Sequence, residues 1–236
     1  MKLFQKMKKT LLEFALVFAL FVLNPIFSQI FAYFLDGVQA SPMLAEYNAS
    51  VFFLAILSFL LVLEFPTRIF HTKPILEEQK RADFIRCLSC ANICFGSLCL
   101  ISAVSLLFLH LFNVSAPEQK ILPPKNALGW INFALGTPCA AFSEEVIFRL
   151  YLPSRFSLFF EKENDSFFSF RRFVLECIPL ALFSLAHFYQ GFFGILNAFL
   201  CAIALRRCFL KTRSIFVPFF VHALYNFCVF ALFWLI

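Results

Sequence analysis

The chain has 236 residues, of which 61% are hydrophobic and only 14% are charged, whereas soluble domains contain about 25% charged residues. A soluble fold of this length could bury a core, but the remaining residues could not supply the polar surface that water requires. The composition therefore excludes an ordinary soluble protein and predicts a multi-pass protein with membrane lipid around it. The net charge of +6 does not indicate a nucleic-acid partner, because no basic binding module accompanies it.

Apolar stretches follow one another along the chain, with lengths that suit a hydrocarbon layer about 30 Å thick. They cover residues 10–34, 49–65, 87–113, 128–151, 173–189, 191–206 and 214–236. The two stretches on either side of Tyr189-Gln190-Gly191 are short, so we expect them to form a helical hairpin. The predicted fold is an all-α, polytopic transmembrane helical bundle of about seven spans.

The sequence shows no boundary between domains. No internal repeat, phosphate-binding loop or low-complexity tail interrupts it. We therefore expect residues 1–236 to form a single integral membrane domain. Within it, residues 1–113 supply spans without motifs, and residues 128–230 carry the polar motifs described below.

Lysine and arginine residues gather in alternate connections between the predicted spans. They occur before the first span and within residues 66–86, 152–172 and 206–213, whereas the opposite connections contain only Lys120 and Lys125. By the positive-inside rule, the N-terminus is predicted to be cytoplasmic and the C-terminus to lie outside. We expect the membrane to be the plasma (cytoplasmic) membrane.

The stretch SEEVIFRL places Glu144, Glu145 and Arg149 inside the fourth span. An ionisable group at the centre of a membrane helix costs about 2.5–3.5 kcal/mol on insertion scales, so each of the three needs a partner. Glu145 and Arg149 are four residues apart and can pair on one helical face in the favourable order. Glu144 points in another direction and needs a partner on another helix. All three could nevertheless serve only to hold the bundle together.

Two later spans add polar residues. Phe183 and His187 are one helical turn apart near the end of the fifth span, and His222 and Asn226 share one face of the seventh. Intramembrane polar residues normally face one shared interior. We therefore expect Glu144, the two histidines and Asn226 to lie close together.

These residues form three motifs in order, each on its own predicted span: Glu144-Glu145-x-x-x-Arg149, Phe183-x-x-x-His187 and His222-x-x-x-Asn226. Together they resemble the motifs of the CPBP family, also known as the Abi family, of CAAX-processing endopeptidases and bacteriocin-processing or immunity proteins. The resemblance implies an intramembrane endopeptidase whose substrate is a membrane-associated protein or peptide. It also implies that Glu145 and Arg149 support the motif helix.

The hydrolysis of a peptide bond needs an activated water, donors for the oxyanion and a proton for the leaving amine. Glu144 has no partner within its own helix and is the predicted general base. His187 is predicted to orient the water or to donate to the oxyanion, and His222 and Asn226 to contact the oxyanion and the substrate. We expect the cavity around them to open to the cytoplasm.

Zinc is an alternative use of the same residues. Glu144, His187 and His222 would supply one carboxylate and two imidazoles and leave a position for water. The HExxH signature is absent. The family is commonly labelled metallopeptidase, although a metal-free glutamate mechanism is also proposed for it. We favour the metal-free mechanism, with no cofactor.

Two other functions use the same polar set. A non-proteolytic immunity or scaffold protein would bind a peptide or partner in the pocket without cleaving it. A small-solute or ion transporter would relay protons through Glu and His, but the spans show no repeated halves. The sequence leaves the substrate open among prenylated CAAX tails, leader peptides and regulatory membrane proteins.

Four cysteines lie on the third span: Cys87, Cys90, Cys94 and Cys99. The first three share one helical face, and such a spacing can support metal or redox chemistry. In the predicted orientation they enter the membrane from the reducing side, where disulfides are rare. We interpret them as small apolar packing residues.

Overall fold

The computed structural model describes residues 2–28, 43–45, 47–64, 77–112, 121–160 and 170–235. These residues are helical apart from short turns and two strands, β1 (Met43–Leu44) and β2 (Ile121–Leu122), which pair in parallel. The predicted all-α bundle is confirmed. The helices are α1 (Lys2–Phe18), η1 (Ala19–Leu23), α3 (Ala49–Glu64), α5 (Glu77–Leu111), α6 (Ala127–Glu145), η2 (Val146–Tyr151), α7 (Leu152–Phe160), α8 (Phe170–Leu185), η3 (Phe188–Gln190), α9 (Gly191–Thr212) and α10 (Phe216–Leu235).

Four helical segments in the described ranges are long and apolar enough to cross a membrane: Lys9–Ser28, Asp83–Leu111, Phe188–Thr212 and Phe216–Leu235. Two further apolar helices, Ala49–Leu63 and Phe173–Leu185, are shorter. Large apolar side chains are exposed over the surface, as expected where lipid rather than water surrounds a bundle. The chain is therefore an integral membrane protein, and its orientation stays a prediction.

Among the helices that differ from their predicted bounds, two do so for reasons that can be identified. α5 begins at Glu77 rather than at residue 87, because residues 77–86 are rich in Glu, Gln, Lys and Arg, which favour a helix without being apolar. α9 continues past residue 206 and ends where Arg213 adopts a left-handed conformation with φ 56°. The predicted end of the first span, residues 29–34, lies outside the described residues.

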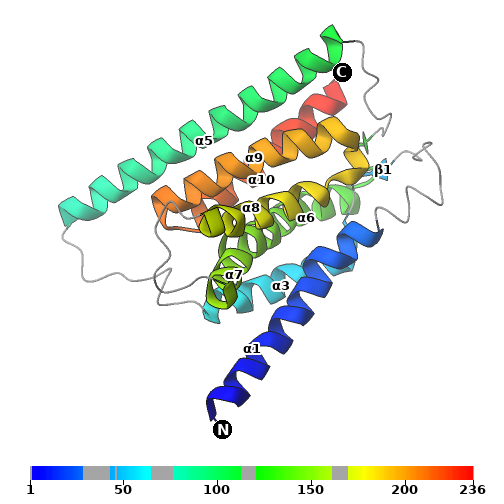
Figure 1. The fold of residues 1–236 in the computed structure, drawn as a ribbon. Helices are drawn as coiled ribbons and strands as arrows, with labels where there is room; N and C mark the ends of the chain where they lie inside the picture. The colour runs from blue at the N-terminus through cyan, green and yellow to red at the C-terminus, as the bar shows by residue number, and fades with distance from the viewer. Residues whose placement is uncertain are drawn as a thin grey trace.

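The motif helix α6 lies in the middle of the bundle (Figure 1). It packs against α3 on one side and against α10 on another. α9 packs between α5 and α8, and α8 turns into α9 through η3, which is the predicted hairpin. This arrangement brings the three helices that carry the motifs into one interior.

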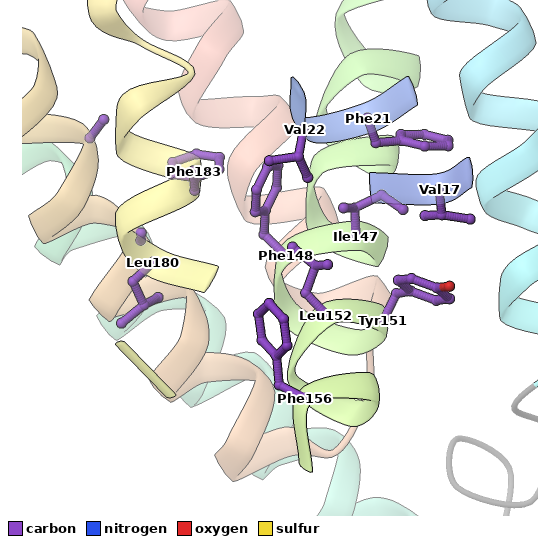
Figure 2. Close-up of a cluster of buried hydrophobic side chains, with 12 residues drawn as sticks. Val17, Phe21, Val22, Ile147, Phe148, Tyr151, Leu152, Phe156, Leu180 and Phe183 are labelled. Atoms are coloured by element: carbon purple, nitrogen blue, oxygen red, sulfur yellow. The ribbon is translucent and has the colours of Figure 1, made fainter. Parts of the chain in front are cut away.

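A hydrophobic cluster joins the first helix to the segment that follows α6. Figure 2 shows its labelled side chains: Val17, Phe21, Val22, Ile147, Phe148, Tyr151, Leu152, Phe156, Leu180 and Phe183. At its edge, Tyr151 Oη and Arg155 Nη2 donate to the same oxygen of Glu13, at 2.8 and 2.7 Å. The first helix thus has both an apolar and a charged attachment to the motif region.

The segment before α3 is fastened to α6 through Tyr47. The backbone N–H of Tyr47 donates to Asn132 Oδ1 at 2.6 Å, and Asn132 Nδ2 donates to the carbonyl of Tyr47 at 2.9 Å. Thr137 Oγ1 donates to the phenol oxygen of Tyr47 at 3.2 Å. The Tyr47 side chain lies directly over Gly136, where an added Cβ would be 2.8 Å from the Cβ of Tyr47. This close approach requires glycine.

Gly136→Ala is expected to destabilise the protein by about 1–3 kcal/mol, because the new methyl group overlaps the Tyr47 side chain. Thermal unfolding of the purified protein in detergent would measure the change. Gly96→Ala on α5 is the matched control, since nothing lies within 4 Å of a Cβ at that position. An equal loss of stability in both variants would contradict the close packing of Tyr47 on α6.

Candidate active site

The SEEVIFRL segment spans the change from α-helix to π-helix. α6 ends at Glu145, and η2 continues from Val146 to Tyr151 with all of its side chains buried. Single-turn π segments occur frequently at functional sites. The two adjacent glutamates meet different surroundings, because the side chain of Glu145 is 0% exposed and that of Glu144 is 34% exposed.

Glu145 is held by partners on two helical segments. Its Oε1 accepts a hydrogen bond from His222 Nδ1 on α10 at 2.9 Å, and its Oε2 lies 3.4 Å from Arg149 Nε. The ion pair that the four-residue spacing predicts is therefore present, and His222 is an additional partner. A buried carboxylate held in this way connects η2 to α10 and is poorly placed to receive a substrate.

The guanidinium of Arg149 is fully buried. Its Cζ lies 4.1 Å from the ring centroid of Phe183, and its nitrogens make no hydrogen bond within the part of the chain that the structure describes. Its charge is therefore balanced by Glu145 and by the face of an aromatic ring. The backbone carbonyl of Arg149 accepts a hydrogen bond from Arg206 Nη1 at 2.5 Å. Arg206 also donates to both oxygens of Glu176, at 2.8 and 2.7 Å, and so joins α8, η2 and α9.

His222 lies between the two glutamates. While its Nδ1 donates to Glu145, its Nε2 lies 3.7 Å from Glu144 Oε2. This second distance is too long for a direct hydrogen bond, although a bridging water can span it. Asn226 lies one turn further along α10 and is half-buried. Its side chain makes no hydrogen bond to any residue in the described ranges.

His187 lies just beyond the end of α8, and its ring orientation is set by its neighbours. Its Nδ1 donates to the backbone carbonyl of Phe183 at 2.9 Å, since a carbonyl oxygen can only accept. In the neutral imidazole, Nε2 is then left as an acceptor. The ring centroid lies 4.7 Å from that of Phe183 and 6.2 Å from that of Tyr189.

A cavity of about 220 Å³ brings Glu144 and His187 together. This space can hold several water molecules or a side chain. Its polar lining residues are Ser143, Glu144, His187 and Tyr189, and its apolar wall consists of Phe21, Pro25, Val51, Leu54, Ala140, Ile147, Phe148, Phe183 and Ala186. His222 and Asn226 are not among the described residues that line it, and His222 instead approaches Glu144 from α10.

Two features of the site were not predicted from the motifs. Tyr189 lines the cavity, and its phenol oxygen accepts a hydrogen bond from Gln190 Nε2 at 2.9 Å, so its own O–H can still donate. Its place in the turn after His187 is the only signal in the sequence. Arg206 belongs to a run of basic residues that, in the sequence, indicates only the orientation of the chain in the membrane. In the structure it binds the backbone of the motif segment.

Within the described ranges, no group of three His, Cys, Asp or Glu side chains is arranged to hold an ion. The Nδ1 atoms of His187 and His222 bind a carbonyl and Glu145, and their Nε2 atoms make no such bond to any described residue. Histidines that bind a metal commonly hold their other ring nitrogen in this way. Zinc binding by Glu144, His187 and His222 therefore stays a prediction.

Residues 125–228 match the family model described as Rce1-like, type II CAAX prenyl endopeptidase. The matched range contains all three motifs and begins just before α6. The resemblance to CAAX-processing endopeptidases is thereby confirmed over this range. No curated protein and no solved structure matches the chain.

The different surroundings of the two glutamates predict different effects on stability. Glu145→Gln would leave the buried Arg149 without a charged partner, and breaking a buried ion pair costs about 3–5 kcal/mol. We expect a large drop in the unfolding temperature in detergent.

Glu144→Gln is the matched comparison, because its partly exposed side chain makes no close ion pair. We expect its stability to stay within about 0.5 kcal/mol of the wild type. Equal destabilisation by the two substitutions would contradict the division between a structural and a cavity-facing glutamate.

Proposed function

We propose that this chain, whose residues 125–228 match the Rce1-like family, is an intramembrane endopeptidase that uses a water activated by Glu144. The family match supports a CAAX-type membrane endopeptidase in general. The proposal that Glu144 activates the water rests on the cavity that both Glu144 and His187 line, beside the buried Glu145–His222 pair. Its substrate would be a membrane-associated protein or peptide.

In the proposed first step, Glu144 removes a proton from water while the water oxygen attacks the carbonyl carbon of the scissile bond. Glu144 suits this role because its carboxylate is partly exposed at the cavity, and no lysine or arginine among the described residues forms an ion pair with it. His187 Nε2, which remains an acceptor while Nδ1 binds the carbonyl of Phe183, can orient the second proton of the water.

The negative charge that develops on the carbonyl oxygen needs preorganised donors. We assign this role to the O–H of Tyr189, which lines the cavity. The roles predicted for His222 and Asn226, as contacts of the oxyanion and the substrate, would require the substrate to extend from the cavity toward α10. The proton that Glu144 holds then passes to the leaving nitrogen as the C–N bond breaks. Glu145 and Arg149 would act as positioning residues, because they hold η2 against α10 and Phe183.

Whether the cavity opens to the cytoplasm depends on how deep in the membrane the η3 turn lies. Phe21, Pro25 and Val51 share the cavity wall with Tyr189, so the end of the first helix and the start of α3 meet the turn. In the orientation predicted from the basic residues, these segments lie toward the outer side. A cytoplasmic opening therefore requires the opposite orientation or a turn well inside the membrane. The short apolar helix Phe173–Leu185 supports such an internal turn.

Peptide cleavage is the direct test of this function. Wild type and Glu144→Gln would be reconstituted in lipid vesicles and incubated with a library of quenched peptides, with and without a chelator. General-base catalysis contributes about 10²–10⁴-fold, so we expect Glu144→Gln to lose activity by that factor. We expect the chelator to leave the wild-type rate unchanged.

Each other outcome points to a different function. Cleavage that survives Glu144→Gln would overturn the proposed mechanism, and chelator-sensitive cleavage that zinc restores would transfer water activation to a metal. The absence of cleavage by folded wild type would favour an immunity or scaffold protein. Substrate-dependent ion or solute flux across the same vesicles would indicate a transporter.

Tyr189→Phe tests whether the phenol donates to the oxyanion. Loss of one oxyanion donor lowers kcat by about 10²–10³-fold in known cases, and we expect a fall in that direction with KM unchanged. Tyr225→Phe is the matched control, because Tyr225 contacts Ser102 away from the cavity. A change in KM alone would instead give Tyr189 a role in substrate binding.

A further inference from the structure

A second hollow lies outside the candidate active site, between α5 and α9. Its volume is about 420 Å³. Apolar side chains of both helices form much of its wall, among them Ile93, Leu100, Leu200 and Ile203. The motifs do not involve this groove, and no step of the proposed hydrolysis uses it.

One end of the groove is positively charged. Arg207 and Lys211, one turn apart near the end of α9, line it and are exposed. Arg86 of α5 crosses to the same end, where its Nη2 donates to the backbone carbonyl of Lys211. No acidic side chain is among the described lining residues, and the nearest acid on α5, Asp83, lies one turn before Arg86.

The charged end coincides with a predicted membrane boundary. The apolar segment of α9 ends at Thr212, and that of α5 begins at Asp83, so the two antiparallel helices reach their polar ends together (Figure 1). Lipid headgroups lie at this level, whereas the apolar part of the groove lies at the level of the acyl chains. Lysine and arginine side chains at such a boundary extend toward the headgroups.

We propose that this groove is a binding site for an anionic phospholipid. The headgroup phosphate would contact Arg207 and Lys211, and an acyl chain would lie along the apolar wall between α5 and α9. Basic pockets between transmembrane helices bind anionic headgroups, and the guanidinium fork of arginine matches a phosphate. A second copy of the chain fits less well, because a two-fold contact would bring the same cations together.

The test measures lipid retention by native mass spectrometry of the full chain purified in detergent. The protein would be incubated with phosphatidylglycerol or with phosphatidylcholine of the same acyl chains. We expect wild type to retain one phosphatidylglycerol in preference to phosphatidylcholine. Arg207→Gln/Lys211→Gln should weaken that retention roughly thirtyfold, since each basic residue near the membrane surface strengthens the binding of an anionic lipid about fivefold.

Lys9→Gln/Lys125→Gln is the matched control, because it removes two exposed charges away from the groove and should retain the lipid. Ala204→Phe is a second variant, which fills the apolar part of the groove and should displace the lipid with both cations intact. Equal retention of the two lipids by wild type, or equal losses in both double variants, would overturn the proposal. A dimer that Ala204→Phe loses and that the Arg207/Lys211 variant keeps would assign the groove to a second copy instead.

Discussion

The buried contact of Glu145 with Arg149 and His222 is the interaction on which the rest of the site depends. Lipid cannot solvate these groups, and an isolated charge in that environment is strongly unfavourable. The fold meets this constraint by burying all three together, with the Arg149 guanidinium over Phe183 and the Glu145 carboxylate bonded to His222. Because these contacts come from η2, α8 and α10, they fix the relative positions of the three segments that carry the motifs.

The same contact explains how two adjacent glutamates acquire separate roles. Once Glu145 has taken the Nδ1 atom of His222 and the Arg149 charge, Glu144 is left at the cavity that His187 also lines, with the Nε2 atom of His222 at a longer distance. A general base must be accessible to water, and of the two glutamates only Glu144 is partly exposed at the cavity, which supports the role proposed for it. In the proposed mechanism, the buried cluster would act on the reaction indirectly, by holding the motif segment so that the neighbouring carboxylate faces the cavity.

The sequence was sufficient to predict the features that depend on local constraints. Hydropathy predicts the helices, because a chain in lipid must satisfy its backbone internally, and the spacing of Glu145 and Arg149 predicts their ion pair. Contacts between distant segments could not be predicted in this way. The bond between His222 and Glu145 and that between Arg206 and the Arg149 carbonyl depend on how whole helices pack, which no local spacing encodes. The π-helical turn and the position of Tyr189 on the cavity also follow from tertiary packing.

The polar groups of the cavity and part of its apolar wall come from different parts of the chain. Glu144, His187 and Tyr189 lie within residues 125–228, which match the family, whereas Phe21, Pro25, Val51 and Leu54 lie outside that range. Apolar wall residues of a cavity determine which side chains or lipid-like groups fit, while polar groups determine the reaction. The first helix is held at the wall by its apolar cluster and by the pairing of Glu13 with Arg155. In the proposed function, the selection of the substrate would therefore depend in part on the motif-free first half of the chain, whose residues share the cavity wall with apolar residues of the second half.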